Sequence, residues 1–353
     1  MKYSFSALAL AGMASAAAVN TNASPVSVSL SSMGDTTVKA VITNNGDKDY
    51  NIMHKGTILD SVPVNKFQVT KGADTASFHG IKVRMGTTGF HEDDFTALSP
   101  GESKEVVVDL ASIYGLDKSG AYDVSASGRF RVAEAGSTEL VRGAGVRFSS
   151  NSVKINVDGH KASQVTKAIH ESLASRSTID SDCTASQKTT VQDGIDKCKA
   201  QANAAADAAV NGSASKFKEY FMSTATKDRS YVADRFKAVA KECGATDGGV
   251  LTVHCKDTYG YCRSNDFAYT VSDDDTVVWC NEYYNAPLET STCHGDDKTG
   301  TTIHEFTHAS SVFDPPTEDH AYGYDDCVAL DRAEALENAD TYEYYANAIH
   351  LDC

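Results

Sequence analysis

Cysteine is absent from the first 182 residues of this 353-residue chain, although nine cysteines follow. Such asymmetry predicts a domain boundary near residue 177, just before the first cysteine. After the N-terminus, no run approaches the roughly 18 apolar residues of a membrane-spanning helix. The sequence also lacks a basic patch and a glycine-rich phosphate loop. These absences argue against nucleic-acid and membrane partners.

The N-terminus has the composition of a secretory signal peptide. Lys2 provides a short basic region, residues 6–13 are largely apolar, and residues 14–19 are mostly small. We therefore expect residues 1–19 to be a signal peptide and the protein to be exported, soluble and extracellular. Cysteines pair in such a compartment, and because nine is an odd number, one thiol should stay unpaired within the chain.

Two segments of different periodicity follow. Short alternating runs such as Val26–Leu30 and Ile81–Met85 are frequent in residues 20 to about 160 and predict antiparallel strands in a β-sandwich. Alanine-rich stretches of helical spacing fill most of residues 177–353, with a shorter strand section around Gly248–Trp279. The sequence therefore predicts an α+β chain with a β-rich N-terminal part and a mainly helical C-terminal part.

Basic residues are scarce in the C-terminal part. From residue 177 onward there are 31 acidic and 14 basic residues, a formal charge of −17, whereas the remainder carries +1. A field of this sign attracts basic substrates and repels nucleic acid and anionic membranes. Two interpretations stay open, because the same acidity could serve only to keep a secreted protein in solution.

Residues 304–308 read His-Glu-Phe-Thr-His, the HExxH pattern. On a helix, His304 and His308 lie on one face, so both imidazoles can bind one metal ion while Glu305 lies beside a water molecule at that metal. The pattern falls in a stretch of helical spacing that follows the loop 295–300. It predicts a metallopeptidase.

A catalytic zinc site needs a third protein ligand and leaves its fourth position for water. Asp314 would suit an unusual version of the metzincin pattern, and Glu334 or Glu337 would suit the gluzincin type. A further candidate is Asp319, and its neighbour His320 is expected at the rim of the site rather than as a fourth ligand. Spacing alone leaves the choice open.

The catalytic half resembles the deuterolysins, secreted fungal zinc endopeptidases in which HExxH is followed by Asp-x-x-Tyr-Gly. Here Asp319-His-Ala-Tyr322-Gly323 fits, and Asp319 comes 11 residues after His308. The resemblance implies that Asp319 is the third zinc ligand and that the domain carries one Zn²⁺. Pro316 stands where the family has glycine, so the resemblance does not fix the turn before Asp319.

Roles follow from chemistry and from the resemblance. Glu305 would be the general base that takes the proton of the attacking water. Tyr322 resembles the family tyrosine that hydrogen-bonds the oxyanion, and Asp340 resembles an acid that orients an active-site group. Simpler interpretations stay open for both: Tyr322 as a packing residue and Asp340 as a solvated residue on a helix face.

The resemblance also covers the layout of the chain. It implies a propeptide, residues 20–176, that inhibits the enzyme and assists folding, followed by the catalytic domain, residues 177–353. The three disulfides that it implies are Cys183–Cys255, Cys262–Cys280 and Cys293–Cys353. We add Cys198–Cys243, joining two helices, and expect Cys327 to remain free.

We therefore expect a monomeric, secreted zinc endopeptidase with a mainly helical, zincin-like catalytic domain behind a β-rich, sandwich-like propeptide. Its substrates would be proteins and peptides, with the preference for basic proteins that the family shows. The alternative is a secreted zinc-binding or adhesion protein without hydrolytic activity. Loss of the Glu305 function, or a secreted form that keeps residues 20–176, would favour that alternative.

Overall fold

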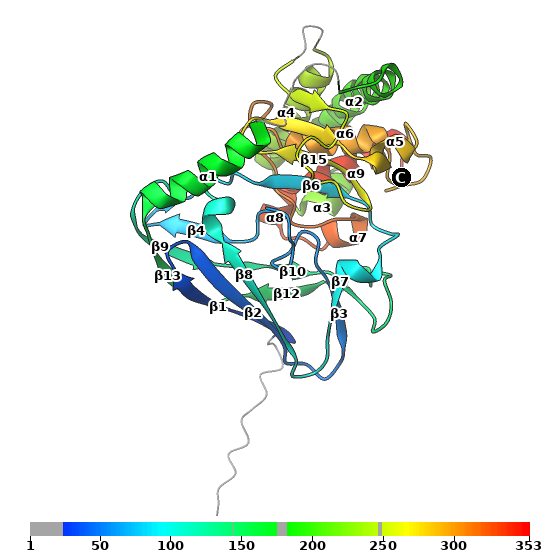
Figure 1. Ribbon diagram of the computed structural model, residues 1–353. Coiled ribbons are helices and arrows are strands. Elements are labelled where there is room, and N and C mark those ends of the chain that lie inside the picture. The colour runs from blue at the N-terminus through cyan, green and yellow to red at the C-terminus, as the bar shows by residue number, and fades with distance from the viewer. Residues whose placement is uncertain (1–23, 144, 175–181, 246–248) are drawn as a thin grey trace, which may run out of the picture.

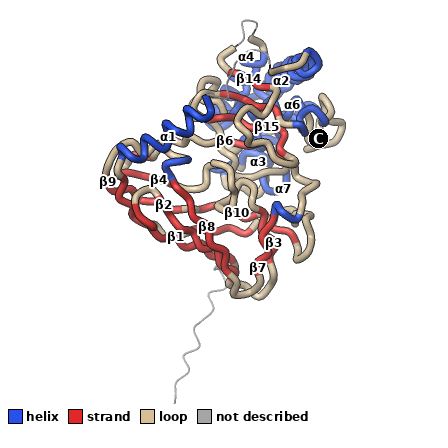
Figure 2. Tube along the Cα trace, viewed as in Figure 1, coloured by secondary structure: helices blue, strands red, loops and turns tan. Residues whose placement is uncertain are grey.

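Buried hydrophobic side chains form two large clusters, one drawn from residues 26–162 and the other from residues 191–348. Strands dominate the first half of the chain and helices the second (Figures 1 and 2), so the α+β class is confirmed. The expected signal peptide, 1–19, and the expected maturation site after residue 176 lie outside the described residues. The computed structural model describes residues 24–143, 145–174, 182–245 and 249–353.

Within the described residues, the N-terminal half contains four antiparallel sheets, of order β1-β2-β8, β13-β9-β4-β5, β11-β3-β7 and β10-β12. Every second side chain of β2 is buried, starting at Val38, because neighbouring side chains of a strand point to opposite faces. The strands are β1 (Val26–Gly34), β2 (Thr37–Asn44), β3 (Tyr50–Met53), β4 (Gln68–Lys71), β5 (Asp74–Thr75), β7 (Phe95–Leu98), β8 (Ser103–Asp109), β9 (Gly120–Ser125), β10 (Ser127–Phe130), β11 (Val132–Ala133), β12 (Val146–Ser149) and β13 (Val153–Val157). Short 3₁₀ turns, η1 (Glu92–Asp94) and η2 (Leu110–Ser112), and the helix α1 (Gly159–Ala174) complete this half.

The C-terminal half is built around packed helices. Thr184 and Gln187 form a capping box that begins α2, which packs along α4. The rings of Phe221, Phe236 and Tyr345 form an aromatic cluster between α3, α4 and α9. The helices are α2 (Ala185–Asn211), α3 (Ala214–Phe221), α4 (Thr226–Cys243), α5 (Asn281–Asn285), α6 (Lys298–Thr307), α7 (Tyr324–Cys327), α8 (Arg332–Leu336) and α9 (Ala339–Leu351).

The sequence also has helical spacing throughout residues 215–240 and 327–351, which predicts one helix in each stretch, but each stretch contains a break. The first stretch is interrupted because Met222 adopts a left-handed conformation, with φ of 50°, at the end of α3. The second is divided into α8 and α9 by Glu337 and Asn338. Each break separates two helices. The helix after the break at Glu337 and Asn338 is α9, which packs against α6.

One strand predicted for the β-sandwich lies elsewhere. β6 (Ile81–Met85) joins the strand section of the C-terminal half, in a sheet of order β14-β16-β15-β6, with β14 (Thr252–His254), β15 (Asp266–Val271) and β16 (Thr276–Trp279). All five residues of β6 are buried. The prediction was wrong because period-2 alternation identifies a strand but does not identify its sheet.

The four expected disulfides are present, and Cys327 is the free, buried thiol. Cys293–Cys353 ties the end of the chain to the loop before α6, and Cys198–Cys243 joins α2 to α4. Cys183–Cys255 and Cys262–Cys280 hold the segment around β14 and β15. Within the described part of the chain, no helix has the length and apolar character needed to cross a bilayer.

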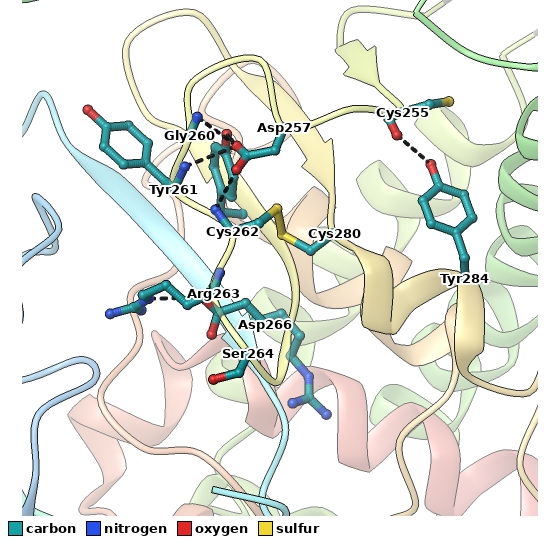
Figure 3. Close-up of a disulfide and its surroundings, with 12 residues drawn as sticks. Cys255, Asp257, Gly260, Tyr261, Cys262, Arg263, Ser264, Asp266, Cys280 and Tyr284 are labelled. Atoms are coloured by element: carbon teal, nitrogen blue, oxygen red, sulfur yellow. Dashed lines mark hydrogen bonds and ion pairs between the residues drawn. A yellow bond between two sulfur atoms is a disulfide. The ribbon is translucent and has the colours of Figure 1, made fainter. Parts of the chain in front are cut away.

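The loop before β15 is fixed from two sides (Figure 3). The carboxylate of Asp257 accepts hydrogen bonds from the backbone N–H groups of Gly260, Tyr261 and Cys262, at 2.8 to 3.0 Å. Cys262 is also bonded to Cys280, which directly follows β16. The start of β15 is therefore held firmly against β16.

Candidate metal centre

The HExxH sequence lies at the end of α6, which is buried along its whole length. Asp297 caps the first turn, because its Oδ1 accepts a hydrogen bond from Gly300 N at 2.6 Å. The helix ends at Thr307, and the next residue keeps helical backbone angles. His304 and His308 therefore still share one face of the helix.

Three side-chain atoms meet beside this face. Nε2 of His304 lies 3.0 Å from Nε2 of His308, and Oδ1 of Asp319 lies 3.3 Å and 3.2 Å from these nitrogens. Ligands about 2.0 Å from a tetrahedral zinc ion are about 3.3 Å apart, so these atoms have the spacing of three corners of such a site. Asp319 Oδ1 is buried and has no hydrogen-bond partner among the described residues. The three side chains therefore fit a metal ion.

The opposite nitrogen of each imidazole faces a fixed oxygen. Nδ1 of His304 lies 2.8 Å from Oδ1 of Asp340, and Nδ1 of His308 lies 3.1 Å from the carbonyl oxygen of Thr317. Asp340 is fully buried and also accepts a hydrogen bond from Gly323 N at 2.8 Å. The hydrogen bond between His308 Nδ1 and Thr317 leaves Nε2 of His308 available as a ligand, and the carboxylate of Asp340 beside Nδ1 of His304 favours the same arrangement in that ring.

The other candidate third ligands lie apart from the two histidines. In the described part of the chain, His304 belongs to two groups of potential metal ligands, and neither group contains Asp314, Glu334 or Glu337. Glu334 instead accepts a hydrogen bond from Asp331 N at the start of α8, and Glu337 is exposed. The two groups are His304–His308–Asp319 and His304–Asp340–Glu343.

The turn before Asp319 is held by the end of α6. Thr317 N donates to the carbonyl of Thr307 at 3.0 Å, and the hydroxyls of these two threonines are 2.7 Å apart. The turn is therefore held through the backbone N–H and hydroxyl of Thr317, and not through Pro316, which has no backbone N–H. The departure from the family glycine is compatible with Asp319 reaching the histidines.

Glu305 is fully buried next to the three ligand atoms. Its Oε2 accepts a hydrogen bond from the Thr270 hydroxyl at 2.6 Å, and its Oε1 accepts one from Arg84 N at 3.2 Å. Burial raises the pKa of Glu305 to about 8, although the nearby His304 opposes this shift. The carboxyl group can therefore hold or release a proton near neutral pH.

Tyr322 follows Asp319 by three residues and is buried. Its ring packs with Met85 and Phe90, and the guanidinium of Arg131 lies 4.8 Å from the ring centre. Burial raises the pKa of the phenol well above its ordinary value, and the carboxylate of Asp319 adds to the shift. The hydroxyl therefore remains a hydrogen-bond donor, while the ring packs against residues of the N-terminal half.

Sequence reasoning missed the acidic pocket next to His304. Glu343 Oε2 lies 3.5 Å from His304 Nδ1 and accepts a hydrogen bond from Arg84 Nε at 2.6 Å. Asp296 lies 2.6 Å from another nitrogen of Arg84. Glu343 could have been noticed, because it lies one helical turn after Asp340 on the same face. Arg84 could not, because it is 259 residues from Glu343 in the chain.

A model of the deuterolysin metalloprotease (M35) family matches residues 1–353. The chain belongs to this family. A neutral protease 2 homolog of Phaeosphaeria nodorum is 42% identical over 98% of this chain and 97% of its own length. The neutral protease 2 of Aspergillus oryzae is 39% identical over 98% and 97%, and the penicillolysin of Penicillium citrinum is 40% identical over the same shares.

Membership of the deuterolysin family makes this chain a metalloprotease, so it uses a metal ion and acts on proteins. The group of His304, His308 and Asp319 is a place in the described structure where such an ion fits, because the three ligand atoms are mutually close and Asp319 Oδ1 lacks a hydrogen-bond partner.

Proposed function

We propose that the protein is a zinc endopeptidase whose metal ligands are His304, His308 and Asp319. The observation that carries this proposal is the convergence of their three ligand atoms at mutual distances of 3.0 to 3.3 Å. Two imidazoles and one carboxylate, with a fourth position left for water, form a donor set typical of catalytic zinc. When bound, zinc supplies Lewis acidity that lowers the pKa of water and polarises a peptide carbonyl.

The side chains around these ligands then have separate tasks. Glu305 takes a proton from the attacking water and passes it to the leaving amine, while Thr270 holds the carboxylate in place through its hydroxyl. Tyr322 donates its phenolic hydrogen to the oxygen of the peptide carbonyl as negative charge develops there. Asp340 orients His304 by accepting the proton on Nδ1.

The preferred substrates are basic proteins. The pocket next to His304 already holds a guanidinium group, that of Arg84, between Glu343 and Asp296. The formal charge of −17 over residues 177–353 has the sign that attracts basic chains over longer distances. Pocket and field therefore support the same preference.

The chain is made as a secreted precursor and acts as a monomer. Residues 1–19 form the signal peptide, 20–176 a propeptide that inhibits the enzyme and assists folding, and 177–353 the mature catalytic domain. Four disulfides, all within residues 183–353, suit an extracellular enzyme. The mature domain would keep every proposed ligand.

The test is cleavage of a histone-like protein by zinc-loaded, processed enzyme, with Glu305→Gln and Glu337→Gln beside the wild type. The amide of Glu305→Gln cannot accept a proton, so that variant should hold one zinc ion and lose activity. Glu337→Gln is the matched control, because Glu337 is exposed and is an alternative ligand by spacing. Full activity of Glu305→Gln would refute the general-base role. If all three proteins bind zinc without activity, the protein is a non-hydrolytic zinc binder.

A further inference from the structure

Strand β6 comes from the N-terminal half and runs along the edge of the C-terminal sheet, antiparallel to β15 (Figure 1). Residues 81–84 pair with residues 268–271 of β15. β6 is therefore an extended chain added to a sheet edge, the way in which many domains bind peptides.

The backbone of β6 also reaches the proposed catalytic groups. Val83 N donates to Oδ2 of Asp319 at 2.9 Å, and Arg84 N donates to Oε1 of Glu305 at 3.2 Å. Arg84 N is the nitrogen of the Val83–Arg84 peptide bond. The nitrogen of a substrate's scissile bond must lie near the same carboxyl group, because that group returns the proton to the leaving amine.

The side chain of Arg84 fills the acidic pocket. Its Nε lies 2.6 Å from Glu343, its Nη2 lies 2.6 Å from Asp296, and the residue has no exposed surface. Asp340 is 3.5 Å from Nε. A fully buried guanidinium is tolerated only with such charged partners, so the pocket is built for a cationic side chain.

Lys82, two residues before Arg84, anchors the same strand. Its Nζ donates to the carbonyl of Thr317 at 2.6 Å and lies 3.2 Å from Glu318. Thr317 and Glu318 belong to the turn that carries Asp319. On the other face of β6, Val83 packs with Tyr269 and Val278 of the sheet. The strand is therefore held through its backbone and through both of its faces.

We propose that β6 is a built-in substrate mimic, with the Val83–Arg84 bond at the position of a scissile bond and Arg84 in the pocket for the residue that follows it. This inference rests on the proposed function. Both oxygens of Glu305 accept hydrogen bonds while β6 is bound, one from Arg84 N and one from Thr270. The N-terminal half thus inhibits by occupying the substrate path.

The test uses the zinc-loaded full chain with Glu305→Gln, which prevents self-digestion, and adds Arg84→Glu. Repulsion between the new carboxylate and the pocket should release β6 and speed hydrogen exchange of β15 amides at least tenfold. Lys104→Glu, an equal charge change at an exposed residue of β8, should leave that exchange unchanged. Protection of β1 and β2 shows that each variant is folded. If Arg84→Glu does not fold, Arg84→Ala replaces it with the same expectation.

A fluorescent synthetic peptide of residues 78–90 is the binding probe. It should bind the Arg84→Glu chain and not its parent, and the same peptide with alanine at position 84 should bind at least tenfold more weakly. Unchanged β15 exchange, or equal binding of the two peptides, would overturn the proposal. Neither readout needs hydrolysis, so failure of the proposed catalytic roles would be seen separately, in the activity of Glu305→Gln.

Discussion

The orientation of His304 depends on a residue that carries no ligand atom in the proposed site. Asp340 faces Nδ1 of His304 at 2.8 Å and is itself held by Gly323 N. A histidine free to rotate would present Nε2 to the metal only part of the time. In the proposed site, Asp340 would therefore contribute to metal affinity without touching the metal.

Replacing Asp340 tests this contribution. Asp340→Ala should lower zinc affinity about 10- to 100-fold, because His304 loses the acceptor that fixes its ring. Asp340→Asn keeps an acceptor and should lose less. Zinc titration with a competing chelator measures the change, with the exposed Asp234→Ala on α4 as control. Equal affinities of Asp340→Ala and Asp234→Ala would show that Asp340 does not orient the ligand.

A single glycine sets the distance between α2 and the neighbouring elements. Glycine inside a helix is usually less stable than alanine by about 1 kcal/mol. A methyl group on Gly194, however, would collide with the hydroxyl of Tyr283, whose ring is stacked on Trp279 with centroids 4.1 Å apart. It would also press on Thr302 of α6, at 3.3 Å.

We therefore expect Gly194→Ala to destabilise the protein by about 1–3 kcal/mol, reversing the usual sign for this substitution in a helix. Urea unfolding of the zinc-loaded chain measures the difference. Gln192→Ala, on the exposed face of the same helix, is the control and should change stability little. A more stable Gly194→Ala variant would mean that the Tyr283 ring moves aside without cost.

At the level of elements, one ion pair connects the start of α4 to α8. Asp228 lies in the first turn of α4 and accepts hydrogen bonds from Arg332, at 2.7 Å from Nε, and from Ser223, at 2.5 Å. The hydrogen bonds from Arg332 lower the pKa of Asp228 from its ordinary 3.8 to about 2. The folded state therefore favours the charged carboxylate.

The sign of the pH effect follows. A carboxylate with a lowered pKa stabilises the fold above its ordinary pKa of 3.8, and this contribution disappears as the pH falls through about 2. Asp228→Asn should thus lower the unfolding midpoint near neutral pH and match the wild type near pH 2. Denaturant titrations of the metal-free proteins measure both, with Asp234→Asn as control. A constant difference between wild type and Asp228→Asn at both pH values would contradict the expectation.

The sequence predicted local features better than contacts between distant elements. HExxH and Asp-x-x-Tyr-Gly are short motifs, so they mark His304, His308 and Asp319 as candidate ligands without knowledge of the fold, and the structure brings these three together. The resemblance supplied three of the four disulfides. The sheet of β6 depends on contacts such as that of Arg84 with Ala268, 184 residues away, and the pocket of Arg84 depends on a contact 259 residues away, which alternation cannot encode. The helix ends at Met222 and Glu337 depend on tertiary packing in the same way.

At the scale of the whole molecule, the acidic C-terminal half meets cations of the N-terminal half. Besides the pairs of β6, Lys55 lies 3.4 Å from Asp266 and Arg147 lies 3.6 Å from Glu334. Arg263 with Asp60, 2.5 Å apart, is a pair among the described residues in which the cation comes from the C-terminal half and the acid from the N-terminal half. The acidity of residues 177–353 therefore also serves contact between the halves, a use that neither sequence interpretation included.

Substrate steering by the same acidity has a measurable consequence. The processed enzyme should cut a protamine-like protein faster than an acidic protein at low salt. The ratio should fall as salt rises, because the screening length shrinks from about 10 Å at 0.1 M to about 3 Å at 1 M. An uncharged peptide is the control for effects of salt on catalysis itself. Equal rates for both proteins at low salt would remove any steering role.

If residues 20–176 are removed as proposed, the pairing of β6 with β15 has a further consequence. β15 then becomes the end strand of its sheet, with a row of backbone N–H and C=O groups that no strand covers. Such an open edge is a template for strands of other molecules, including other copies of the enzyme. During folding and export, the N-terminal segment that we propose as the inhibitor would thus also protect the protein against edge-to-edge aggregation.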